Sequence, residues 1–403
     1  MNTRPVLDSD KGPFALSASF NADNSCFSVA LESGFRVFSS KSGDQRVARS
    51  LGGSLSHAEM LGTTRYLALI GGGLRPKFPS NKVQIYNDAS SAITTSLELS
   101  APIQRVRISQ THLIVVLVHA VQIYKMALPP SKIAEYETAP NPLGLCALGT
   151  TVVAFPGLTT GQLKIYHLST GNVSIIPASS SSLRCIALSQ DASRVATASE
   201  AGTLVRVWEV SSCTKVAELR RGVDPAVILG LAFSPSGGSV AVSSDKGTLH
   251  VFDLRGESSS GGSGAAAQGG GRPGAQAGEG TGADQHKWRL LSKLPLLPRQ
   301  FSDTYSNCSC PFSLGDDYTH SSHSAHPTRS PHAPTSPSSA APSTKTPGVP
   351  GARPTKGLLG WLDESTVICI GAGQDARWEK FVVGYDQGGK RAVWREGWRR
   401  YLE

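Results

Sequence analysis

The chain has 403 residues, of which 39% are hydrophobic and 17% charged, and 39 lysines and arginines against 30 aspartates and glutamates give a formal net charge of +9. This length accommodates one large domain or two ordinary ones. The positive charge favours a polyanionic partner such as nucleic acid, an acidic protein or an anionic membrane surface, unless it is simply spread over the surface. No signal peptide is predicted in the polar residues 1–12, and the longest aliphatic run, residues 113–118, is too short for a membrane span. Any membrane contact is therefore expected to be peripheral.

Six segments share one ending, in which an apolar residue, a variable residue and Val or Ile precede an aromatic residue. They are FRVF, VQIY, a second VQIY, LKIY, VRVW and LHVF, which end at Phe38, Tyr86, Tyr124, Tyr166, Trp208 and Phe252. The aromatic residues follow one another at intervals of 38 to 48 residues, the period of a four-stranded propeller blade. Each segment also alternates apolar and variable positions, as strands do.

A second strand and a tight turn precede several of these endings. In residues 195–203 and 240–248 the turn carries a glycine at the same place, Gly202 and Gly247. Glycine tolerates the positive φ that tight hairpins need. An earlier apolar strand ends in a turn, as in residues 228–237. Because helix patterns are nearly absent, the sequence predicts an all-β fold built from WD-type blades.

A seventh segment, EKFVVGY, ends at Tyr385, 133 residues after Phe252. One blade period accounts for about 40 to 45 of these residues and leaves roughly 90 surplus. A Gly/Ser/Ala-rich tract and a Ser/Pro/His-rich tract supply most of the surplus, and neither can bury a core, so both are predicted to be disordered. Such insertions are tolerated because loop closure costs little more as length grows. The sequence predicts a single seven-bladed WD40-type β-propeller with disordered insertions in the sixth-blade region.

The predicted organisation has five parts. Residues 1–255 hold blades one to five and the first part of blade six, 256–285 the Gly/Ser-rich insert, 286–316 the sixth-blade loop and outer strand with a candidate membrane-contacting segment, 317–356 the Ser/Pro/His-rich insert, and 357–403 the seventh blade.

No catalytic or metal-binding motif is evident. The seven cysteines show no framework, so reduced thiols in a cytosolic protein are expected, and Cys308 and Cys310 are too close for a metal knuckle. His320, His323, His326 and His332 lie in the second insert, where no fixed surroundings would support a metal ion. The phosphate-binding and hydrolase motifs are absent from the sequence. We therefore expect no enzyme, no cofactor and no metal site.

Two adjacent arginines follow the VRVW strand, in residues 216–225, VAELRRGVDP. Successive side chains of a strand point to opposite faces, so Arg220 and Arg221 cannot easily serve one site. As the outer strand of the fifth blade, this segment lies at an edge, where charged residues can simply block edge-to-edge pairing.

The flanking hairpins favour a different role for the pair. They carry small hydroxyls, glycine backbone and basic residues, which donate hydrogen bonds to phosphate oxygens, and arginine adds a fork that matches phosphate. Taken singly, Thr203 and Thr248 are ordinary turn residues. The hypothesis is that Arg220 faces the fifth-blade set and Arg221 the sixth-blade set, which makes two anion pockets, one on each side of a shared strand.

The chain resembles the PROPPINs, the WD-repeat phosphoinositide-interacting or autophagy-related protein 18 family. The residues that carry the resemblance are the LRRG motif at 219–222, the hairpins ASEAGTLVRVW and SSDKGTLHVF, LSASFN at 16–21 and YLALIGGGLRPKFPSNKVQIY at 66–86. Two of these features are most similar to the branch containing human WIPI-three and WIPI-four. They are the stretch at 66–86 and Leu219, which stands in place of the more common Phe of FRRG.

This resemblance implies a non-enzymatic effector of autophagosome formation that binds phosphatidylinositol 3-phosphate and 3,5-bisphosphate. It implies one site of Thr197, Ser199, Gly202, Thr203, Arg206 and Arg220, and a second of Arg221, Gly222, Ser244, Thr248 and His250. It also implies a cytoplasmic protein, peripherally bound to preautophagosomal and endosomal or vacuolar membranes. Its partners would be autophagy proteins, among them a large lipid-transfer protein held by the second and third blades.

In this family the sixth-blade loop inserts into the bilayer, and here residues 288–301 keep apolar character with interspersed bases. Leu290, Leu291, Leu294 and Leu297 fall on one helical stripe, although Pro295 and Pro298 oppose a long helix. With Leu296, these leucines are the candidate membrane-contacting residues. The alternative is that they cover the flank of the sixth blade.

Two other functions remain open from the sequence. One is a WD-repeat scaffold for protein partners without lipid specificity. The other is a nucleic-acid binder, which is supported only by net charge and lacks aromatic residues interleaved with bases for stacking. We expect a monomer without nucleic acid.

Overall fold

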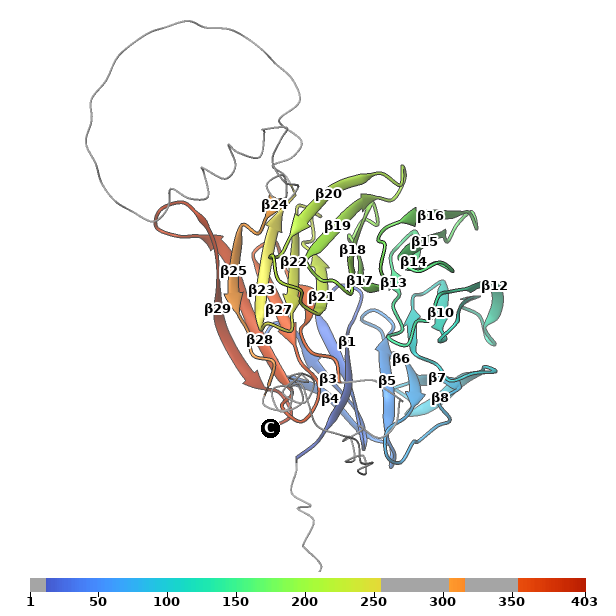
Figure 1. Ribbon diagram of the computed structural model, residues 1–403. Helices are drawn as coiled ribbons and strands as arrows, with labels where there is room; N and C mark the ends of the chain where they lie inside the picture. The colour runs from blue at the N-terminus through green and yellow to red at the C-terminus, as the bar shows by residue number, and fades with distance from the viewer. Residues whose placement is uncertain (1–11, 255–303, 316–353) are drawn as a thin grey trace, which may run out of the picture.

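The computed structural model describes residues 12–254, 304–315 and 354–403, and the structural statements below concern these ranges. Their strands form seven sheets arranged around a central axis (Figure 1), and they contain no helix. None of them therefore forms a helix long and apolar enough to cross a bilayer. The predicted seven-bladed β-propeller is confirmed.

The first four blades are each built from four consecutive antiparallel strands. Blade one contains β1 (Ala15–Phe20), β2 (Cys26–Leu31), β3 (Gly34–Ser39) and β4 (Gln45–Ser50). Blade two contains β5 (Leu55–Met60), β6 (Tyr66–Gly71), β7 (Lys82–Asn87) and β8 (Ala92–Glu98). Blade three contains β9 (Arg105–Ile108), β10 (His112–Val116), β11 (Ala120–Lys125) and β12 (Ser131–Glu137). Blade four contains β13 (Ala147–Leu148), β14 (Val152–Pro156), β15 (Gln162–His167) and β16 (Val173–Pro177).

The last three blades include the strands that follow the long interruption. Blade five contains β17 (Leu183–Leu188), β18 (Arg194–Ser199), β19 (Leu204–Glu209), β20 (Lys215–Arg220) and, as a fifth strand, β24 (Thr304–Tyr305). Blade six contains β21 (Ile228–Phe233), β22 (Ser239–Ser244), β23 (Thr248–Asp253) and β25 (Cys308–Pro311). Blade seven contains β26 (Leu358–Trp361), β27 (Thr366–Ile370), β28 (Arg377–Tyr385) and β29 (Arg391–Arg400).

Apolar side chains fill every interface between neighbouring blades. Each of the seven buried clusters joins the second and third strands of one blade to those of the next. The inner strands are thus buried on both faces, which explains their nearly continuous apolar runs. The outer strands β12, β16, β20 and β29 lie at the periphery (Figure 1) and alternate exposed with less exposed residues along much of their length. Edges that face water require this alternation.

The repeated aromatic residue packs against the preceding blade. Trp208 and Phe252, for example, lie in the clusters between blades four and five and between blades five and six. In blade seven the equivalent residue is Phe381, which is fully buried, whereas Tyr385 is 70% exposed. The predicted strand does end at Tyr385, but β28 and β29 form a longer hairpin, so the interface aromatic lies four residues earlier.

The ring closes through side-by-side packing of blades one and seven. β1 pairs with β2 of its own blade, and its first residue, Ala15, exchanges two backbone hydrogen bonds with Gly373. The Trp378 indole donates to the Ser40 carbonyl at 2.8 Å. The Tyr401 ring meets Phe27 and Phe38 edge-on, so no strand has to be exchanged between terminal blades.

Candidate functional site

Arg220 and Arg221 lie where β20 ends, and the strand directs them to different sides. Leu219 is fully buried between blades five and six. Because successive side chains alternate, Arg220 faces the side toward blade four. The backbone N–H of Arg221 donates to the Thr203 carbonyl at 3.0 Å, which continues the pairing of β20 with the fifth-blade hairpin.

The guanidinium of Arg221 is held over the hairpin by carbonyl oxygens. Its Nε donates to the Gly202 carbonyl at 3.1 Å, and its Nη2 donates to the Asp224 carbonyl. Burial lowers the pKa of Arg221, and the carboxylates of Asp245 and Asp224 oppose this effect. The side chain is therefore positioned before any ligand binds.

Beside Arg221, a chain of side-chain hydrogen bonds crosses blade six. Ser244 and Thr248 hydroxyls lie 3.2 Å apart, His250 Nε2 lies 3.1 Å from the Thr248 hydroxyl, and His250 Nδ1 lies 3.2 Å from the Ser306 hydroxyl. We term these four residues and Arg221 the Arg221 cluster. Burial, and then the positive charge of Arg221, lowers the pKa of His250 to about 4.

The opposite face of blade five carries a second polar group. Arg206 Nε donates to Glu218 at 2.9 Å, Lys215 reaches the same carboxylate oxygen at 2.9 Å, and Arg206 Nη1 donates to the Ala178 carbonyl. Burial raises the pKa of Glu218, but the hydrogen bonds from Lys215 and Arg206 outweigh it and the net shift is downward. Arg206 is therefore already paired with an anion of the protein.

Thr197 and Ser199 lie deeper than Arg206. Thr197 is 3% exposed, and its hydroxyl accepts a hydrogen bond from the Trp208 indole at 3.1 Å. Ser199 is 8% exposed, and its carbonyl accepts from the backbone of Gly202 at 3.0 Å. Thr197 thus contributes to the packing of blade five.

The two hairpin glycines have different constraints. Gly202 adopts φ of +62°, and an added Cβ would lie 1.6 Å from the Ala226 carbonyl oxygen. Only glycine fits there without moving the chain. Gly222, next to the arginines, has no atom within 4 Å of an added Cβ.

The arrangement suits phosphate oxygens. The Arg221 cluster combines a guanidinium, three hydroxyls and an imidazole, all of which donate hydrogen bonds to oxyanions. Among the described residues, no group of three His, Cys, Asp or Glu side chains is arranged to hold a metal ion.

Comparison with known proteins places the chain in a family. The PROPPIN family model matches residues 15–270. The chain belongs to the PROPPIN family. This PROPPIN is 45% identical over 343 residues to SVP1-like protein 2 of Emericella nidulans, which covers 85% of the chain and 99% of that relative.

Solved structures share the fold of this PROPPIN. Hsv2 of Kluyveromyces lactis matches with a TM-score of 0.69 and 18% identity over 96% of the chain and 99% of that structure. The complex of KlAtg21 with the coiled coil of AgAtg16 matches with a TM-score of 0.61 and 15% identity over 96% and 99%. At these identities the likeness concerns the fold alone.

The two sets of residues predicted to bind phosphoinositides differ in how this PROPPIN positions them. Four of the residues predicted for the second set lie together: Arg221, Ser244, Thr248 and His250. Gly222, the fifth residue of that set, directly follows Arg221 in the chain. Of the first set, Arg206, Ser199 and Arg220 lie on the opposite face of blade five, Thr203 and Gly202 form its hairpin, and Thr197 is engaged by Trp208. Leu290, Leu291, Leu294, Leu296 and Leu297 lie outside the described residues.

Sequence analysis missed three residues of this region. Ser306 lies outside the recurring strand pattern and in no motif, so no signal indicated it. Asp245 directly follows Ser244, so its position in the sequence could have indicated it. Its carboxylate accepts a hydrogen bond from the Val227 backbone at 2.9 Å. Glu218 lies two residues before Arg220, on the same strand face, and strand periodicity alone predicts that the two share a side.

Proposed function

We propose that this PROPPIN is a non-enzymatic phosphoinositide effector that binds phosphatidylinositol 3-phosphate and 3,5-bisphosphate on membranes and acts in autophagosome formation. The observation that carries the proposal is the divergence of two adjacent arginines. Arg221 contacts the hairpin of blade five and acts on the charge of His250, while Arg220 faces the other side of the same strand. Two headgroups could therefore be held at one rim without competing for one guanidinium.

The small binding free energy expected of each basic residue favours a mechanism in which both sites bind one membrane together. A basic residue near an anionic surface contributes roughly 1 kcal/mol. Two such pockets act on one surface at high effective concentration, so their weak affinities reinforce each other. The segment with the five candidate leucines rejoins the described chain at β24, which pairs with β20 beside Leu219 and Arg220. A membrane contact by that segment would add to the same assembly.

Protein partners at the second and third blades are part of the proposal. Ile93 on β8 is 39% exposed and Ile133 on β12 is 46% exposed. Apolar side chains at the rim support a protein contact there, because they lose water on binding. The KlAtg21 complex shows that a protein of this fold binds a coiled coil. By the family resemblance we propose autophagy proteins, including a lipid-transfer protein, as the partners of this face.

We also propose that the protein is cytoplasmic and binds peripherally to preautophagosomal and endosomal or vacuolar membranes. By the family resemblance, these membranes would present the 3-phosphorylated lipids that we propose as ligands.

The test is flotation with liposomes that contain or lack a few per cent of phosphatidylinositol 3-phosphate. The wild type is compared with Arg220→Thr, Arg221→Thr and the double variant. We expect lipid-dependent flotation that each single change weakens and the double change nearly abolishes. Flotation of the double variant equal to wild type would overturn the proposal, and lipid-independent behaviour of all forms would favour a scaffold without lipid specificity.

A further inference from the structure

The axis of the propeller holds a cavity of about 1220 Å³, and none of the Arg221 cluster, Arg206 or Glu218 lines it. The first strand of every blade contributes to its wall. One residue from each blade, in chain order, is Ser17, His57, Arg105, Ala147, Cys185, Gly230 and Leu358. Glu59, Arg105 and Arg107 line it from blades two and three. The first strands of blades six and seven contribute small and apolar residues such as Gly230, Ala232 and Leu358.

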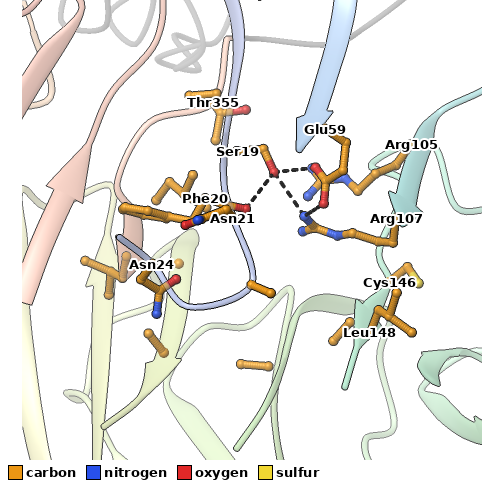
Figure 2. A pocket seen from close by; sticks show the side chains of 18 of the residues that line it. Ser19, Phe20, Asn21, Asn24, Glu59, Arg105, Arg107, Cys146, Leu148 and Thr355 are labelled. Atoms are coloured by element: carbon orange, nitrogen blue, oxygen red, sulfur yellow. Dashed lines mark hydrogen bonds and ion pairs between the residues drawn. The ribbon is translucent and has the colours of Figure 1, made fainter. Parts of the chain in front are cut away.

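One ion pair in this cavity is internally satisfied. Arg107 donates from Nη1 to Glu59 at 2.7 Å and to the Ser19 hydroxyl at 3.0 Å, and that hydroxyl donates to the other Glu59 oxygen at 2.5 Å (Figure 2). The three residues come from three adjacent blades. Glu59 is 8% exposed, and each of its oxygens already has a partner.

Arg105 lies two residues before Arg107 on β9 and has no such partner. Its Nε is buried and meets no hydrogen-bond acceptor among the described residues. Burial, and then the charge of Arg107, lowers the pKa of Arg105 to about 10, and Glu59 opposes the shift only in part. Figure 2 shows both guanidinium-bearing side chains on the same strand at the pocket wall. One carboxylate therefore faces two arginines.

Other side chains in the cavity wall are hydrogen-bond donors or cations. His57 on the neighbouring strand has a pKa lowered to about 3 by burial and by Arg105 and Arg107, so it is neutral at ordinary pH and able to donate one hydrogen bond. Arg184 and Lys356 also line the cavity. A buried N–H group without an acceptor, such as the Nε of Arg105, is costly, and an anion that accepts a hydrogen bond from it removes that cost.

We propose that the central cavity is an anion site in which Arg105 donates to a small tetrahedral oxyanion of the phosphate class. The ion pair of Arg107 and Glu59 forms the floor of the site. Because Glu59 already neutralises Arg107, the anion is bound by Arg105. The same chemistry exists in free inorganic phosphate and in a lipid headgroup, and the experiment separates these two sources.

The test uses the full chain carrying Arg220→Thr and Arg221→Thr, so that the rim arginines do not contribute. Inorganic phosphate is titrated at constant ionic strength, with heat of binding and thermal midpoint as readouts. The background protein is compared with the same protein carrying Arg105→Met, and with a matched control carrying Arg65→Met, which removes an exposed arginine outside the cavity.

We expect saturable binding and a rise of about 3 °C in the midpoint at saturating phosphate for the background and the Arg65→Met protein. Arg105→Met should lose both, and without phosphate its midpoint should equal or exceed that of the background, because a buried N–H group without an acceptor has been removed. A merely structural arginine would instead give a lower midpoint and an unchanged response to phosphate.

Two arms keep the outcome decisive. If the background protein neither binds phosphate saturably nor floats with phosphatidylinositol 3-phosphate vesicles, the proposal is overturned, and this result does not depend on whether the Arg105→Met protein folds. Flotation of the background protein with phosphatidylinositol 3-phosphate vesicles that requires Arg105, without binding of free phosphate, would assign the site to a headgroup. Binding of free phosphate without flotation assigns it to a soluble anion.

Discussion

The Nε of Arg221 donates to the carbonyl of Gly202 across 3.1 Å, so the arginine beside the sixth-blade hydroxyls is fixed by the hairpin of the fifth blade. The position of the guanidinium therefore depends on the backbone of that hairpin. Gly202 can adopt its φ of +62° beside Ala226 only because it has no side chain.

Gly202→Ala should therefore disturb stability and binding together. An added Cβ meets the Ala226 carbonyl oxygen at 1.6 Å, so the hairpin must move. We expect a loss of about 2–4 kcal/mol in the free energy of unfolding and weaker flotation with phosphatidylinositol 3-phosphate. Gly222→Ala is the control for stability because nothing lies within 4 Å of its added Cβ, and it should stay within about 0.5 kcal/mol of wild type in urea denaturation. Equal stability of the two variants would contradict the argument.

Glu218→Gln should increase lipid affinity while it lowers stability. The carboxylate of Glu218 accepts from Arg206 and Lys215, and it competes with any phosphate for them. Loss of this half-buried partner should cost about 1 kcal/mol of stability, and release of the two cations should tighten vesicle binding about fivefold.

The matched control for that variant is Glu98→Gln. Glu98 pairs with Lys82 at 2.9 Å on the second blade, so its loss changes net charge equally but far from the arginines. Vesicle co-sedimentation against lipid concentration gives both affinities. The same gain in both variants would show a general charge effect, and no gain in Glu218→Gln would show that Arg206 serves only the packing of blade five.

The blades could be predicted from the sequence because their apolar residues, aromatic residues and turns repeat at similar intervals. In blades one to six the aromatic near the end of the third strand packs on the preceding blade, so it repeats with the blades and was visible as a pattern. β24 was not, since two residues form it and they pair in parallel with β20, 85 positions away along the chain at Leu219 and Thr304. No local preference encodes so short a non-local pairing.

The same contrast holds for the sites. Arg221 and the hydroxyls of Thr248 and Ser244 belong to a motif with neighbours in the sequence, so their grouping was predictable. Arg105 has an unremarkable context in β9, and its unpaired Nε follows only from the radial arrangement of seven sheets, which brings their first strands to one axis. Charged residues at alternate positions of a first strand are the sequence signal that points to such a cavity.

The stability of the free protein should fall as the pH drops from about 6.5 toward 4, in part because of His250. Its pKa of about 4 in the folded state lies below the unfolded value of about 6.5. In this window the unfolded chain binds more protons, so acidification favours unfolding. The contribution of His250 should be of order 1 kcal/mol between pH 7 and pH 5, given its partial exposure.

The measurement is urea unfolding of the wild type, His250→Gln and His167→Gln at pH 7 and pH 5. His250→Gln should show a smaller loss on acidification than the other two. A remaining slope is expected from His57, whose pKa is lowered to about 3 by burial and by Arg105 and Arg107. Identical losses in all three proteins would show that His250 does not resist protonation in the fold.

Variants of Thr197 can distinguish a packing role of its hydroxyl from a role in ligand binding. Its hydroxyl accepts the Trp208 indole N–H at 3.1 Å inside blade five, and Thr197→Val keeps the shape while leaving that buried donor without an acceptor. The free energy of unfolding should fall by about 1–3 kcal/mol, whereas Thr197→Ser should restore most of it. If the hydroxyl also served a headgroup, Thr197→Val would lose vesicle binding even at a temperature where the protein remains fully folded. We expect flotation to be retained under those conditions, because a 3% exposed side chain already bonded to Trp208 has little of its surface available to a lipid.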